Sequence, residues 1–141
     1  MTTTLKNASS TSKNAFDAIQ KTLTSHKAKQ ITFSYSDNGR IIAIEFTIDI
    51  NGVIYPFRLP ARIENVEKIL YPGRRQLSTT QKDQAYRTAW ANIRDWIAAQ
   101  MAMVDTGMVK TEEIFLPYMI GARGNTFFEE MAESRFLLIG Q

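Results

Sequence analysis

The chain has 141 residues, about the length of one domain, and its hydrophobic content of 44% is enough for a sizeable core. It contains no cysteine, which excludes disulfides and thiolate metal sites. The formal net charge of +3 is only mildly basic, and no apolar run reaches the roughly 18 residues that span a bilayer. We therefore expect a cytoplasmic protein with no membrane partner.

The N-terminal quarter predicts a tail and one helix. Residues 1–11 are rich in Thr, Ser and Asn, which is typical of a disordered tail, and we expect a single domain over residues 12–141. A helix is predicted over about residues 13–24 with Ser12 as its cap. Its apolar positions recur at spacings of three and four and form one stripe; they are Phe16, Ile19 and Leu23.

Three segments of alternating apolar and polar residues predict an antiparallel meander. They cover residues 30–36, 40–50 and 53–59, and the turns between them contain Asn38-Gly39 and Asn51-Gly52. Two-residue turns at both places make every directly paired position apolar, so the three strands share one apolar face. The predicted pairs are Tyr35–Ile42, Phe33–Ile44, Ile31–Phe46, Ile44–Leu59, Phe46–Phe57, Ile48–Tyr55 and Ile50–Val53. Pro56 lacks a backbone donor and indicates that the third strand lies at an edge.

The remainder of the chain predicts helices. A short helix runs from Pro60 to about Leu70, and a long one over about residues 81–105, with Thr80 and Asp83 resembling a capping box. We expect the long helix to lie across the apolar sheet face and to stop at Gly107. Shorter helices are predicted over residues 111–116, ended by a proline, and from residue 125 or 126 to about 133, before an apolar tail, Phe136–Ile139. The predicted class is α+β, in the order α-β-β-β-α-α, with helices on one face of the sheet.

No group of residues predicts catalysis. The single histidine, His26, has no matched nucleophile and is expected to be an exposed linker residue. The acidic residues Glu129 and Glu133 share a helix face without a third ligand, and the loop at residues 121–124 lacks the Lys-Ser/Thr ending of a phosphate-binding loop. The sequence thus predicts a protein that is not an enzyme, with no metal and no cofactor.

Aromatic residues are expected to be in the core. Tyr86, Trp90 and Trp96 lie on the apolar side of the long helix, which favours packing over the stacking of nucleobases. The aromatic residues of the sheet lie on the face assigned to the core, whereas a nucleic-acid-binding sheet exposes them.

The basic residues give the most usable functional signal. Residues 57–94 contain eight Lys and Arg against three acidic residues, whereas residues 95–141 contain three against seven. The arginines at 74 and 75 fall in a loop shortly before the long helix, where they could form a phosphate-binding patch. The alternative is that the basic and acidic regions neutralise each other in the fold. The candidate nucleic-acid-binding residues are Lys27, Lys29, Arg58, Arg62, Arg74, Arg75 and Lys82.

Two stretches carry a resemblance. They are AYRTAWANIRDWIAAQ at residues 85–100 and IFLPY at residues 114–118. Over roughly residues 80–120 the chain resembles uncharacterised proteins of phages and integrated mobile elements. This resemblance implies an accessory role, because such proteins mostly bind nucleic acid or host proteins, and it assigns no functional residue. The predicted order of elements is also similar to that of double-stranded-RNA-binding domains and, loosely, of single-strand annealing proteins.

The sequence therefore predicts a non-enzymatic nucleic-acid-binding accessory protein of a phage or mobile element, which contacts the phosphates of single- or double-stranded nucleic acid. The alternative is a protein-interaction module, such as an inhibitor of a host defence factor, which would use the acidic C-terminal third and the apolar tail. Surplus apolar residues such as Met101, Met103 and Met108 make a homodimer plausible.

Overall fold

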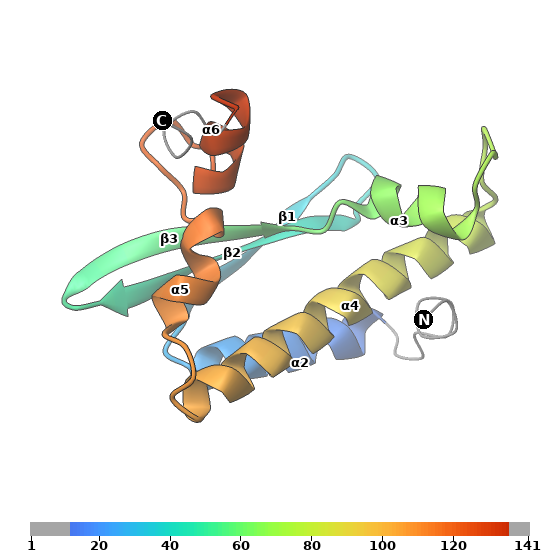
Figure 1. Ribbon diagram of the computed structural model, residues 1–141. Helices are drawn as coiled ribbons and strands as arrows, with labels where there is room; N and C mark the ends of the chain where they lie inside the picture. Colours follow the sequence, from blue (N-terminus) through green and yellow to red (C-terminus); the bar gives the residue numbers. More distant parts are fainter. Residues whose placement is uncertain (1–11, 136–141) are drawn as a thin grey trace. The chain divides into compact units, whose positions relative to one another are not determined.

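The computed structural model describes residues 12–135 and contains one three-stranded antiparallel sheet with helices before and after it (Figure 1). This confirms the predicted α+β class and the order of the elements. The tails predicted at residues 1–11 and Phe136–Ile139 lie outside the described residues. The elements are α2 (Ser12–Ser25), β1 (Lys29–Tyr35), β2 (Ile41–Ile50), β3 (Val53–Pro60), α3 (Ile63–Leu70), α4 (Thr79–Asp105), α5 (Thr111–Phe115), the 3-10 helix η1 (Leu116–Tyr118) and α6 (Phe127–Glu133).

The described chain divides into two compact units, each made of two separate stretches of sequence. The helical unit contains residues 12–25 and 61–100, and the sheet unit contains residues 26–60 and 101–135. Helix α4 continues from the first unit into the second. The expectation of a single domain stays a prediction.

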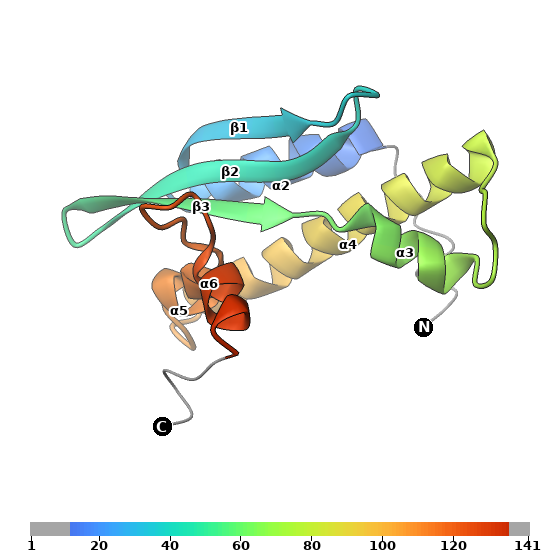
Figure 2. The same cartoon turned by 90° about the horizontal axis from the view of Figure 1, so that it is seen from above.

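The sheet order is β1-β2-β3, so β3 is an edge strand, as Pro56 indicated (Figure 2). The β2–β3 register is the predicted one along its whole length, from Ile50 opposite Val53 to Ile44 opposite Leu59. Asn51 and Gly52 both have positive φ, which is the backbone of a two-residue hairpin turn whose twist matches that of the strands.

The first hairpin differs from its predicted register. Phe33 lies opposite Ile44 as expected, but Tyr35 lies opposite Ile41 instead of Ile42, and further irregularities occur between Lys29 and Thr32. The turn is longer than two residues, since the Ser36 N–H donates to the Arg40 carbonyl at 2.8 Å. The resulting bulge changes which side chains face the core at this end of the hairpin. Tyr35 is 62% exposed and Ile41 is buried. The expectation that Tyr35 faces the core is therefore wrong.

Aromatic packing forms the core of the sheet unit. Phe46 and Phe57 stack across β2 and β3 with ring centroids 5.7 Å apart, and Phe115 of α5 meets Phe46 edge-on at 5.2 Å. All three rings are almost fully buried, which is worth about 2–3 kcal/mol for each side chain. The segment after η1 covers part of the β3 edge, because the Ile120 N–H donates to the Pro56 carbonyl at 2.9 Å.

Helices α2 and α4 pack together within the helical unit. The predicted stripe of α2 is confirmed by the burial of Ile19 and Leu23, and the Phe16 ring lies edge-on to Trp90 with centroids 5.0 Å apart. Trp90 is fully buried and Tyr86 is 9% exposed, so both are core residues as predicted. The short helix α3 buries Leu70 and leaves Ile69 67% exposed.

Capping residues explain where most of the helices begin and end. Helix α4 begins two residues before the predicted start because Ser78, and not Thr80, forms the cap: the Ser78 Oγ accepts from the Gln81 N–H, and the Gln81 side chain accepts from the Ser78 N–H. Pro60 belongs to β3 and does not open α3. Gly107, with φ +75°, ends α4 as predicted, and Thr126 caps α6.

Candidate nucleic-acid interface

The loop between α3 and α4 is built by a proline-glycine turn. Helix α3 ends at Leu70, and the N–H of the next residue, Tyr71, donates to the Glu67 carbonyl at 2.9 Å. Pro72 fixes one turn position, and Gly73 takes φ +77°, which suits the third residue of a type II turn. Such a turn brings its first and fourth Cα atoms within about 7 Å, so it holds Tyr71 and Arg74 near each other.

Arg74 and Arg75 follow this turn, and both side chains are exposed. Neither forms an ion pair or a hydrogen bond with any other residue of the described chain. Guanidinium groups without a carboxylate partner are available to an incoming anion, and their fork of N–H donors matches the oxygen atoms of a phosphate.

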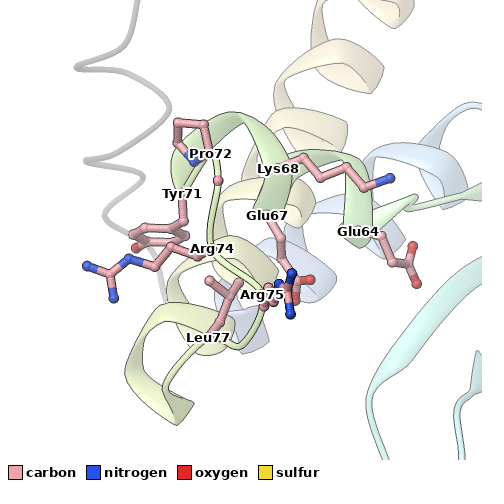
Figure 3. Close-up of a pocket in the computed structure, with 9 residues that line it drawn as sticks. Glu64, Glu67, Lys68, Tyr71, Pro72, Arg74, Arg75 and Leu77 are labelled. Atoms are coloured by element: carbon pink, nitrogen blue, oxygen red, sulfur yellow. The ribbon is translucent and has the colours of Figure 1, made fainter.

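The two arginines line a hollow of about 460 Å³ in the helical unit (Figure 3). Tyr71, Pro72 and Arg74 lie toward one end of this hollow, and Lys68 and Glu64 lie toward the other. The complete lining is Glu64, Glu67, Lys68, Tyr71, Pro72, Gly73, Arg74, Arg75 and Leu77. We call this hollow, with its lining, the arginine hollow.

The charges of the arginine hollow are mixed. Three cationic side chains, from Lys68, Arg74 and Arg75, face two carboxylates, from Glu64 and Glu67. The surplus is positive, but the carboxylates oppose the approach of several phosphates at once. The site therefore suits one or two phosphates rather than a dense array of them.

Arg62 and Lys82 belong to the same unit but do not line the hollow. Arg62 precedes α3 with a left-handed backbone, φ 50°, and its side chain is exposed. Lys82 is exposed on the first turn of α4, just after the loop that carries the arginines. Both can add to the positive potential around the loop.

Arg58 occupies a different environment, in the sheet unit. Its Nε donates to the Glu45 carboxylate at 2.9 Å, and its Nη1 donates to the Gly124 carbonyl at 3.0 Å. Its side chain is 28% exposed. These bonds join β3 to β2 and to the loop at 121–124, so the structure gives Arg58 a fold-stabilising role; a phosphate contact by this residue stays a prediction.

Lys27 and Lys29 line a second hollow, of about 270 Å³, in the sheet unit. Its other lining residues are Gln30, Thr47, Asp49 and Ile54. Both lysines are exposed, and the Lys29 carbonyl accepts from the Thr47 hydroxyl at 3.1 Å. Of the predicted residues, the structure thus brings together Arg74 with Arg75 and, separately, Lys27 with Lys29.

Tyr71 is a lining residue that the sequence reasoning did not select. It is half-buried and presents the one aromatic ring of the arginine hollow. The signal for it was available, because an aromatic residue directly before Pro-Gly-Arg-Arg falls next to the arginines in any tight turn.

The remaining candidate groups have structural explanations. His26 is not the exposed linker residue that was expected, since its ring is 19% exposed and its Nε2 lies 2.8 Å from the Asp105 carboxylate. The Glu129 carboxylate accepts from the Thr126 N–H at 2.7 Å and completes a capping box, which places an acid where an anion would have to bind. Among residues 12–135 no three acidic or histidine side chains form a metal-binding group.

Comparisons with protein families, curated proteins and solved structures find no match for this chain. The resemblance to proteins of phages and mobile elements stays a prediction. Within the described part of the chain, no helix combines the length and the apolar character that crossing a membrane requires.

Proposed function

We propose that this protein binds nucleic acid through phosphate contacts made by Arg74 and Arg75, as a non-enzymatic accessory protein of a phage or mobile element. The observation that carries the proposal is the pair of adjacent, exposed arginines that line a hollow and have no partners in the described chain. Charge-assisted bonds from such guanidinium groups to phosphate are among the strongest hydrogen bonds available at a protein surface.

The other basic residues are expected to contribute less to binding than Arg74 and Arg75. Lys68 lines the same hollow, and Lys82 and Arg62 lie in the same unit, so they add attraction that depends on salt. Lys27 and Lys29 offer a second cationic site in the sheet unit. Contacts to phosphates position a nucleic acid without reading its sequence, so we expect little discrimination between base sequences.

A titration followed by fluorescence anisotropy tests this proposal. Labelled single-stranded DNA, duplex DNA and duplex RNA of equal length are each titrated with the full chain, at low and at moderate salt. We expect binding to at least one of the three that weakens steeply as the salt concentration rises. Absence of binding at low salt would contradict the proposal, because phosphate contacts are strongest there.

A second candidate function is a protein-interaction module, for instance an inhibitor of a host defence factor. The observation that favours it is a group of exposed apolar side chains on η1 and α6, namely Leu116, Phe127 and Phe128, which are 46%, 43% and 41% exposed. Aromatic residues are enriched at protein interfaces. Specific capture of a host protein that is lost in Phe127→Ser/Phe128→Ser would favour this function.

A further inference from the structure

The arginine hollow contains an aromatic ring as well as cationic groups, and this combination selects among nucleic acids. Tyr71 is half-buried, so part of this residue stays accessible to a ligand. It lies toward the same end of the hollow as Pro72 and Arg74 (Figure 3). Flat rings of this kind are the platforms on which unpaired bases stack in proteins that bind single strands.

We infer that the arginine hollow takes one unpaired nucleotide of a single strand, with its base on the Tyr71 ring and its phosphates on Arg74 and Arg75. This inference rests on the proposed function and deepens it, because it names the form of nucleic acid. The turn at Pro72-Gly73 explains why both groups are available together. Tyr71 and Arg74 are its first and fourth residues, and such a turn brings their Cα atoms within about 7 Å.

The size of the hollow fits this ligand. Its volume of about 460 Å³ is in the range of pockets that hold small organic molecules, and one nucleotide is a ligand of that class. A paired base inside a duplex cannot reach the Tyr71 ring, because its faces are covered by its neighbours in the stack. Only an unpaired or terminal base can use the ring.

The carboxylates of the hollow also favour a single strand over a duplex. Glu64 and Glu67 line it together with the arginines. A duplex presents two phosphate backbones, and any phosphate placed near these carboxylates is repelled. A single strand can place its base on Tyr71 and a phosphate on Arg74, both toward the end of the hollow away from Glu64 (Figure 3), so the repulsion falls mainly on duplexes.

Comparing an oligothymidylate with an abasic strand of the same length separates the base from the phosphate. The two strands carry the same phosphates, and only the first has bases to stack. We expect the wild-type protein to bind the oligothymidylate about tenfold more tightly than the abasic strand. We expect Tyr71→Leu to lose most of this preference and to bind the abasic strand as the wild type does, while Tyr71→Phe, which keeps the ring, behaves as the wild type.

Each other outcome is decisive. Equal affinity of the wild type for the two strands overturns the stacking inference but leaves the phosphate-binding function standing. A loss in Tyr71→Leu that is equal on both strands also overturns it, because the change then acts through the arginine loop and not through the base. Binding of neither strand removes the proposed function itself, so the two failures are distinguishable.

Discussion

Arg58 and the adjacent pair Arg74 and Arg75 are the same residue type in opposite situations. Arg58 lies on the polar side of the sheet with its Nε and Nη1 engaged by the Glu45 carboxylate and the Gly124 carbonyl. Arg74 and Arg75 lie on a loop with no ion pair or hydrogen bond to the described residues. In a count of charges all three arginines contribute equally to a basic patch. Their surroundings in the structure are nevertheless different.

The difference shows which cations are available to a ligand. A guanidinium that already binds a carboxylate must break that bond before it can bind a phosphate, and its carboxylate then repels the ligand. A guanidinium that is exposed on a loop and has no such partner loses only its hydration and some side-chain freedom when it binds a phosphate. We therefore expect Arg58 to act mainly in stabilising the fold, and Arg74 and Arg75 to contribute most to the candidate interface.

The largest expected effect follows from removing the loop arginines. We expect Arg74→Ala/Arg75→Ala to weaken binding of nucleic acid about 30- to 150-fold at low salt, because each of the two charge-assisted bonds to phosphate contributes about 1–1.5 kcal/mol. The free energy of unfolding should change by less than about 0.5 kcal/mol, since neither side chain has a partner to lose. Anisotropy titration and urea denaturation measure the two quantities.

The matched control is Lys13→Ala/Lys21→Ala, which removes the same charge from exposed positions on α2. An equal loss of affinity in this control would mean that overall charge, and not the arginine loop, drives binding.

The next largest effect is expected at Arg58, where a substitution should lower stability but leave affinity almost unchanged. We expect Arg58→Ala to lower the free energy of unfolding by about 1.5 kcal/mol, because Glu45 loses a half-exposed ion pair and the Gly124 carbonyl loses a donor. Binding of nucleic acid should stay within about twofold of the wild type. If Arg58→Ala instead keeps its stability and loses affinity for nucleic acid, Arg58 lies in the interface and does not differ in role from Arg74 and Arg75.

A smaller effect, on the free energy of unfolding, is expected at the start of α4, where the arginine-bearing loop ends. We expect Ser78→Ala to lower the free energy of unfolding by about 1 kcal/mol, because it removes the acceptor that caps the Gln81 N–H. Thr80→Ala, within the first turn of the helix, should change it far less. Urea denaturation of the two variants decides between them, and a larger loss in Thr80→Ala would mean that the helix starts later than described.

The smallest effect concerns the carboxylates beside the arginines. We expect Glu64→Gln/Glu67→Gln to strengthen binding of duplex DNA about two- to fourfold, since two repulsive charges, one exposed and one half-buried, are removed from the lining of the hollow. Single-stranded DNA should gain less. A larger gain for the single strand than for the duplex would contradict the arrangement of base and phosphate inferred for the hollow.

The sheet could be predicted from the sequence where a turn fixed the register. Asn51-Gly52 determines the β2–β3 pairing, and this pairing also places Glu45 opposite Arg58. Their ion pair could thus have been foreseen, because directly opposed residues share a face. The bulge that exposes Tyr35 could not, since the longer turn between Ser36 and Arg40 has no distinct signature in the residues around Asn38-Gly39.

The candidate site was predictable only in part. The sequence indicates that Arg74 and Arg75 follow a Pro-Gly turn, which favours an exposed loop. The same turn places Tyr71 next to the arginines, but the sequence does not indicate that the two glutamates of α3 share one hollow with them, because this depends on how the loop folds back on the helix. The other predicted cations are divided between the two units, a separation that is not visible in the order of residues.

The most direct test of the phosphate-binding account is the slope of the logarithm of the association constant against the logarithm of the salt concentration, measured for the wild type and for Arg74→Ala/Arg75→Ala. Each phosphate contact contributes about 0.7 to this slope on a single strand and about 0.9 on duplex DNA. If Arg74 and Arg75 each neutralise one phosphate, the magnitude of the slope falls by about 1.4 on single-stranded DNA. An unchanged slope would show that these two arginines do not contact phosphates and would contradict the account.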